Sequence, residues 1–135
     1  MPSEFPPAVP EIPVSGIAAA AAYYRDRLGF VFDWGGEELG LAGISKGSCR
    51  IFLASAAYRE SRGNVGPSSI WLNLGSPQEV DELHRAWSAA GARIVSVPES
   101  KPWGLHEFTA ADLDGNLLRV FHDFATPERE RRAGR

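Results

Sequence analysis

The sequence predicts an α+β fold built from two similar βαβββ modules, and two observations indicate the repeat. In each half a strand precedes an amphipathic helix, and each helix ends at a glycine, Gly29 in the first half and Gly91 in the second. About three further strands follow each glycine. The chain has 135 residues, 44% of them apolar, so it has room for one domain with a substantial core, predicted over residues 1–126.

The first module is predicted over about residues 8–60. Its first strand, residues 8–14, should lie at a sheet edge because Pro10 and Pro13 have no backbone N–H to donate. Helical spacing of apolar residues predicts a helix that ends at Gly29. Its apolar face comprises Ile17, Ala20, Ala21, Tyr24 and Leu28. Strands are predicted next over residues 30–34, 39–45 and 48–55, and a polar connection over 56–67.

The second module is predicted over about residues 68–123. A strand over residues 69–74 precedes Ser76-Pro77-Gln78-Glu79, which is the pattern of a capping box with proline at the first helical position. The predicted helix places Val80, Leu83, Trp87 and Ala90 on its apolar face. The module closes with a hairpin of strands 105–111 and 117–121, whose turn carries Asp114-Gly115. Residues 127–135 form a charged tail that we expect to be disordered.

Composition excludes several classes of function. The 14 basic and 17 acidic side chains give a net charge of -3. Non-specific nucleic-acid binding favours a basic surface, so we expect no nucleic-acid partner. Cys49 is the only cysteine, so we expect neither an internal disulfide nor a cluster of thiolate ligands. The absence of a disulfide is typical of a reducing compartment, and we therefore expect a cytoplasmic location. No segment has the length and apolar character of a membrane span, and we therefore expect no membrane partner.

Two motifs carry a resemblance to a known family. The hairpin contains Trp103-Gly104, then Phe108, then Asp112-Leu113-Asp114-Gly115-Asn116, and the first helix ends in Tyr-Tyr-Arg-Asp-Arg-Leu-Gly-Phe over residues 23–30. Both resemble the vicinal oxygen chelate superfamily, which includes glyoxalase I, extradiol dioxygenases, fosfomycin-resistance enzymes and bleomycin-resistance proteins. The resemblance implies a curved, incompletely closed mixed sheet around a cleft, and a homodimer.

The resemblance also implies a divalent metal such as zinc, iron, manganese or nickel, held by His, Gln or Glu on four strands. Counted from the matched motifs, these positions fall at Val9, Ile51, Ser69 and Arg119, and none of them is a usual ligand. A guanidinium repels a cation. We therefore expect no metal cofactor and predict no catalytic residue.

A non-standard metal site is the alternative, with His106, Glu107 and His122 as its only candidates. Adjacent residues of a strand point to opposite faces, so His106 and Glu107 should not face the same cleft. This alternative would make the protein a glyoxalase- or dioxygenase-type lyase or isomerase. A ligand-sensing or accessory domain is a third reading.

The pattern that remains is closest to the metal-free bleomycin-resistance branch, whose closing strand also carries Leu-Leu-Arg, as at residues 117–119 here. That branch sequesters a large cationic drug without turning it over. The resemblance therefore implies that this protein binds a cationic or aromatic drug-like small molecule. The candidate ligand-binding residues are aromatic platforms and acids, together with an arginine expected to pair with Glu107 across the hairpin: Trp34, Trp71, Trp103, Asp33, Glu107 and Arg119.

A core position is the simpler explanation for some of the aromatic residues. Trp71 belongs to an apolar strand, and Trp87 lies on the apolar face of the second helix, so both are expected to be buried. Trp103 lies between Pro102 and Gly104 in a loop, where binding residues concentrate. His84 borders the apolar face of the second helix, and we expect it to have a packing or capping role.

Overall fold

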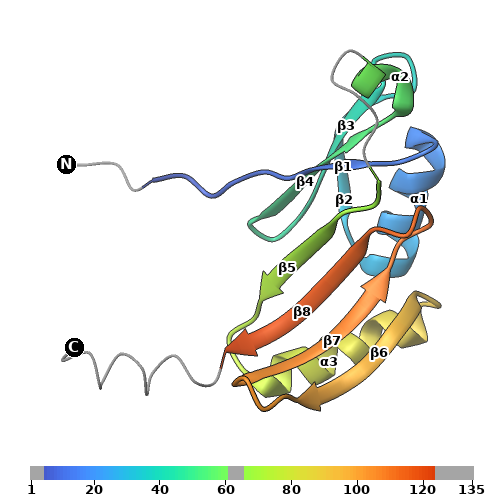
Figure 1. Cartoon of the computed structure of the whole chain (residues 1–135). Helices are drawn as coiled ribbons and strands as arrows, with labels where there is room; N and C mark the ends of the chain where they lie inside the picture. The colour runs from blue at the N-terminus through green and yellow to red at the C-terminus, as the bar shows by residue number, and fades with distance from the viewer. Residues whose placement is uncertain (1–4, 61–65, 124–135) are drawn as a thin grey trace.

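A computed structural model describes residues 5–60 and 66–123 of the chain. It contains two modules in βαβββ order, which confirms the predicted α+β class (Figure 1). Each module has its own four-stranded mixed sheet with one parallel and two antiparallel strand pairs, and neither sheet closes into a barrel. The predicted charged tail at 127–135 lies outside the described residues.

Module one has the sheet order β1-β4-β3-β2, with α1 packed against it. Its elements are β1 (Glu11–Pro13), α1 (Ile17–Leu28), β2 (Val31–Gly36), β3 (Leu41–Lys46), β4 (Cys49–Ala54) and α2 (Ala56–Arg59). The short strand β1 runs parallel to β4 at the sheet edge, as its prolines predicted. Helix α1 ends where predicted, because Gly29 adopts a φ of 78° that disfavours other residues.

Helix α2 corrects the prediction of a plain polar connection from residue 56. The Ser55 hydroxyl accepts a hydrogen bond from the backbone N–H of Tyr58 at 3.4 Å, and so caps this single turn. A helix of four residues is too short to show a periodic apolar pattern, so the sequence contained no signal for it beyond the capping serine.

Module two has the sheet order β5-β8-β7-β6, and α3 packs against β6, β7 and β8. Its elements are β5 (Ser69–Asn73), α3 (Pro77–Ala89), β6 (Arg93–Ser100), β7 (Leu105–Ala111) and β8 (Leu117–Asp123). The predicted cap is present, since the Ser76 hydroxyl accepts from the backbone N–H of Glu79 at 3.1 Å. The Glu79 carboxylate accepts in turn from the backbone of Gly75 at 3.2 Å.

One hydrophobic core runs through both modules, beneath the two long helices. Trp87 of α3 is 3% exposed, which confirms its predicted core position, and its indole N–H donates to the backbone carbonyl of Leu28 at 3.0 Å. The same ring lies edge-on to Phe108, with centroids 5.7 Å apart. Trp87 therefore joins α1, α3 and β7, so the modules pack as one unit.

A buried carboxylate fixes the turn between β7 and β8 to module one. Asp112 is 1% exposed and accepts from the backbone N–H groups of Asp114 and Asn116, both at 2.9 Å. It also accepts from the Asn116 side-chain amide and from the Tyr24 hydroxyl, each at 2.9 Å. The Asn116 amide further donates to the backbone carbonyl of Pro13 at 2.8 Å. The Asp-Gly-Asn turn therefore connects α1, β1 and β8.

We expect this contact to make the protein sensitive to alkali. Tyr24 is fully buried, and that burial, reinforced by the neighbouring Asp112 carboxylate, raises the pKa of its hydroxyl far above the ordinary value. The unfolded chain then releases this proton first, so the stabilisation is complete below about pH 10 and is lost as the pH rises further. In urea unfolding, Tyr24→Phe should cost about 1 kcal/mol at neutral pH and flatten the alkaline decline. An unchanged alkaline slope would contradict this assignment.

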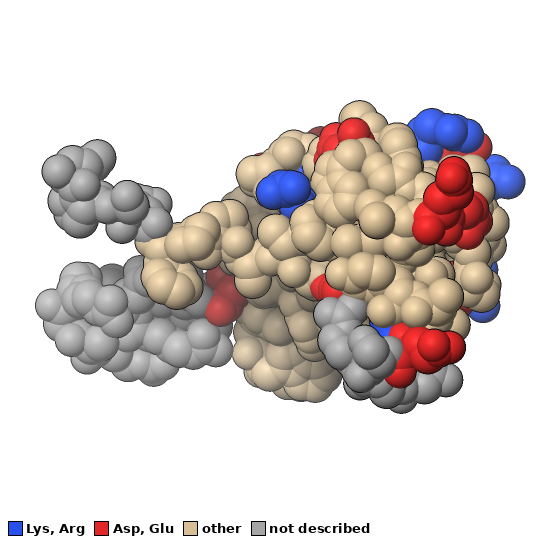
Figure 2. Space-filling model, turned by 90° about the horizontal axis from the view of Figure 1, so that it is seen from above, with Lys and Arg blue, Asp and Glu red and all other residues tan. Residues whose placement is uncertain are grey.

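The surface carries charges of both signs. Figure 2 shows acidic and basic side chains scattered among uncharged ones on the visible face, without a continuous basic patch there. Within residues 5–60 and 66–123, we find no helix with the length and the apolar composition of a membrane span.

Candidate functional site

The two faces of the module-two sheet differ in what covers them. Phe108 of β7 points toward α3, where its ring lies 5.3 Å from His84 and 5.7 Å from Trp87. Alternation along the strand turns the neighbouring residue, Glu107, to the other side of the sheet. We call that side, which α3 does not cover, the open face.

Four side chains form a continuous row on the open face, each from a neighbouring strand or loop. Trp71 of β5 is the register partner of Arg119 of β8, and the guanidinium carbon lies 4.1 Å from a ring centroid of Trp71. Arg119 Nη2 donates to Glu107 Oε1 of β7 at 3.1 Å. Trp103, in the loop before β7, donates its indole N–H to Glu107 Oε2 at 3.3 Å. We refer to Trp71, Arg119, Glu107 and Trp103 as the open-face row.

Exposure within the row increases from its centre outward. Glu107 is 4% exposed and the Arg119 side chain 34%, whereas Trp71 and Trp103 are 46% and 55% exposed. A row that buries its carboxylate and presents two indole rings is suited to contact a flat, largely apolar molecule. The prediction that Trp71 is a core residue is therefore wrong, because its strand lies at the sheet edge and β8 covers only one side of it.

The predicted ion pair between Arg119 and Glu107 is confirmed, with a diagonal geometry. Glu107 pairs in register with Phe121, and Arg119 pairs with Thr109, so the two charged residues share one face two positions apart. Phe121 also supports the row, since its ring lies edge-on to Trp71 with centroids 5.5 Å apart.

Trp34 and Asp33 do not join the row, because they belong to the module-one sheet. The Trp34 ring lies against Gly43, where a side chain would collide with it, and edge-on to Phe52 at 5.1 Å between centroids. Asp33 accepts a hydrogen bond from the Ser45 hydroxyl at 3.2 Å. A register shift in β2 between Phe32 and Trp34 separates Asp33 from the regular alternation.

The residues at the family's metal positions do not fit a divalent cation. Val9 precedes β1, Ser69 begins β5 and Arg119 is engaged with Glu107. Ile51 is fully buried opposite Ile44, so its apolar side chain points into the core and offers no ligand atom. Its neighbours on the other face are Arg50 and Phe52, whose side chains approach each other at 5.6 Å. No oxygen, nitrogen or thiolate ligand set results, so we derive no chemistry through a metal.

The structure does not assemble the alternative metal site either. His106 Nε2 lies 2.8 Å from Asp81 of α3 and Nδ1 lies 2.9 Å from Ser100, on the face opposite Glu107. His122 Nδ1 lies 2.9 Å from the Leu74 carbonyl. Among the described residues, no group of three His, Cys, Asp or Glu side chains is placed to hold a metal ion.

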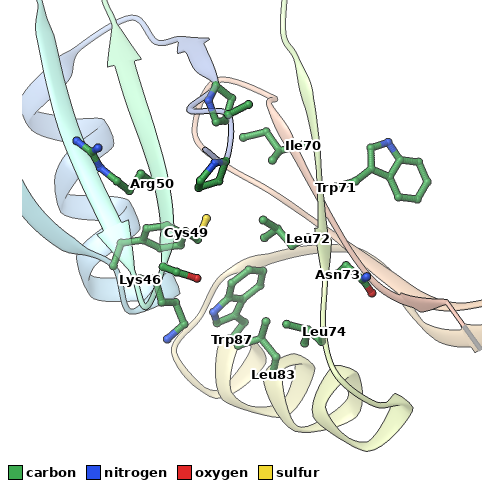
Figure 3. Close-up of a pocket in the computed structure, with 15 residues that line it drawn as sticks. Lys46, Cys49, Arg50, Ile70, Trp71, Leu72, Asn73, Leu74, Leu83 and Trp87 are labelled. Carbon is green, nitrogen blue, oxygen red and sulfur yellow. The ribbon is translucent and has the colours of Figure 1, made fainter. Parts of the chain in front are cut away.

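A cavity of about 420 Å³ lies between the modules, and no local pattern in the sequence predicts it. Figure 3 shows Ile70, Leu72 and Leu74 pointing toward it, together with Trp87 and Leu83 of α3, whereas Trp71 points away. Lys46, Cys49 and Arg50 contribute from the hairpin of β3 and β4. Burial raises the pKa of the Cys49 thiol, which disfavours the reactive thiolate. This cavity and the open-face row therefore lie on opposite sides of β5.

The comparisons with known proteins agree with the fold. The model of the glyoxalase/bleomycin resistance protein/dioxygenase superfamily matches residues 8–120. No curated protein matches the sequence. Among solved structures, a bleomycin-binding protein from the bleomycin-producing Streptomyces verticillus, complexed with copper(II)-bleomycin, is 25% identical, with a TM-score of 0.66 over 87% of this chain and 96% of that one.

Two further structures share the fold at lower identity. TioX from Micromonospora sp. ML1 is 21% identical, with a TM-score of 0.70 over 85% of this chain and 97% of its own. A lactoylglutathione lyase from Agrobacterium tumefaciens is 22% identical, with a TM-score of 0.68 over 88% and 96%. The family model covers most of the chain and the two-module architecture agrees with it, so this protein belongs to the glyoxalase/bleomycin resistance protein/dioxygenase superfamily.

Proposed function

We propose that this protein binds and sequesters a planar aromatic, drug-like small molecule on the open-face row, without a metal cofactor. The observation that carries the proposal is the pair of half-exposed indoles, Trp71 and Trp103, at the two ends of an ion pair whose carboxylate is buried. A large aromatic side chain left half in water contributes little to folding, whereas a stacked ligand ring would cover it.

The row is already ordered before any ligand arrives. Arg119 stacks on Trp71, and Glu107 accepts the indole hydrogen of Trp103, so both rings are held by contacts within the protein. Binding then costs less side-chain entropy than it would for freely rotating tryptophans. Each stacking contact is worth roughly 0.5 to 1.5 kcal/mol beyond the area that it buries.

The superfamily contains both binding proteins and enzymes, so membership alone does not choose between them. We favour binding because the residues at the metal positions include a valine, a buried isoleucine and a paired arginine. The solved bleomycin-binding proteins of the same fold support this choice. We further propose that the protein acts as a homodimer, in which a second copy faces the open face, and that it works in the cytoplasm.

The first test is titration of tryptophan fluorescence with bleomycin, whose heterocycles provide the flat rings that the row would stack. We expect saturable quenching. The affinity derived from it should fall about tenfold in Trp71→Ala, because the loss of one stacking platform costs about 1.4 kcal/mol of binding free energy. Phe32→Ala is the matched control, since Phe32 is 44% exposed on β2 and lies outside the row. Binding that is equally weakened in both variants would argue against the row.

Elemental analysis of the same protein, purified without chelator, completes this test. We expect far less than one equivalent of zinc, iron, manganese or nickel per chain. In a separate measurement, the molar mass from light scattering should be that of a dimer. A full equivalent of metal in the active preparation would replace the binding proposal by the lyase or isomerase alternative.

A further inference from the structure

The acid of the open-face row is not available to a cationic ligand. Both oxygens of Glu107 are occupied, Oε1 by Arg119 at 3.1 Å and Oε2 by the Trp103 indole at 3.3 Å. Its side chain is only 4% exposed. A ligand cation would therefore have to displace an internal hydrogen bond before reaching the carboxylate.

Arg119, the cation of the row, has hydrogen-bond donors that no acceptor within the described residues satisfies. The Arg119 guanidinium carries five N–H groups, and within the described part of the chain only Nη2 has an acceptor. Its Nε is buried without any hydrogen-bond partner. The side chain remains 34% exposed beside Trp71, so water or a ligand can reach part of the guanidinium.

A second cation lies near the other end of the row. Lys101 Nζ is 5.7 Å from the Trp103 ring centroid, and it lies 3.1 Å from Glu99. Asp33, which the sequence suggested as a second acid for the ligand, lies on the module-one sheet and accepts from Ser45. Lys101 is neutralised by Glu99, whose side chain is 64% exposed against 25% for Lys101, so the Trp103 end of the row has no surplus of positive charge. Next to Trp71, by contrast, the accessible charge is the Arg119 guanidinium.

From this arrangement we infer that the row selects planar aromatic molecules that carry an acidic group, with the acid bound by Arg119 and the ring stacked on Trp71. A carboxylate can accept two parallel hydrogen bonds from a guanidinium, which an ammonium or a neutral amide cannot do. This inference rests on the proposed binding function and narrows it to one class of ligand.

The test compares three probes that share one ring system: 2-naphthoate, 2-naphthamide and 2-naphthylmethylammonium, each titrated calorimetrically into the full chain. We expect 2-naphthoate to bind about tenfold more tightly than either of the others. In Glu107→Gln this advantage should grow, because a neutral amide oxygen competes less well for the Arg119 guanidinium than the Glu107 carboxylate does. In Arg119→Gln it should vanish, because Glu107 is then uncompensated and attracts the ammonium probe.

Arg85→Gln provides the control for net charge, since Arg85 is an exposed residue of α3, away from the open face. It should leave the order of the three probes unchanged. Equal affinities for the three probes, all reduced by Trp71→Ala, would overturn the acidic-ligand inference and leave the binding function standing. Absence of binding by all three probes and by bleomycin would overturn both. Glu107→Gln keeps the inference testable even if Arg119→Gln fails to fold.

Discussion

Asp112→Ala is expected to lower the free energy of unfolding by about 3 to 4 kcal/mol, the largest loss for any single polar residue of this protein. The substitution removes an acceptor that serves four hydrogen bonds at 2.9 Å within a buried site. The Tyr24 hydroxyl and the Asn116 amide would remain buried without that acceptor, so the variant suffers their desolvation in full. Urea unfolding followed by circular dichroism measures the loss.

Asp114→Ala is the matched control in the same turn. The Asp114 carboxylate accepts one hydrogen bond, from the backbone N–H of Ser15 at 3.0 Å, in an exposed setting. Its removal should cost about 1 kcal/mol, because water can replace the lost acceptor. If the two alanine variants lose the same stability, Asp112 does not hold the modules together as described.

The hairpin was predictable because its register depends on local chemistry. Asp114-Gly115 fixes the turn, and Gly115 adopts the expected positive φ of 83°. Once the turn is placed, alternation along the strands puts Glu107 and Arg119 on the same face, and this is why their ion pair could be predicted from sequence. The contact of Asp112 with Tyr24 joins residues 88 positions apart, and no local pattern encodes it.

Other features of the site depend on which face of a strand is covered, and the sequence does not encode this. The side chain of Ile51 points into the core, and a count from distant motifs does not reveal which face of β4 a residue occupies. The register shift in β2, which no local pattern predicts, takes Asp33 out of the regular alternation of the strand. Trp71 was expected in the core because its strand is apolar, but sequence does not reveal which face of an edge strand a helix will cover.

Arg119→Met gives the second large effect, an expected loss of about 2 to 3 kcal/mol, because it leaves the Glu107 carboxylate buried without its cation. Glu107→Gln should cost about 1 kcal/mol, since Arg119 is one-third exposed and can turn to water. The unequal costs follow from the unequal burial of the two partners. Urea unfolding of both single variants and of the double variant forms the cycle that measures their coupling.

The double variant should be more stable than the sum of the single losses predicts, with a coupling energy of about 1 to 2 kcal/mol. Methionine at position 119 also removes the buried Nε that has no partner, which recovers part of the lost stability. Strict additivity would show that the pair contributes no mutual stabilisation. A substantial coupling, together with weaker binding of an aromatic acid by Arg119→Met, would show that Arg119 both stabilises the open-face row through Glu107 and binds the acidic group of the ligand.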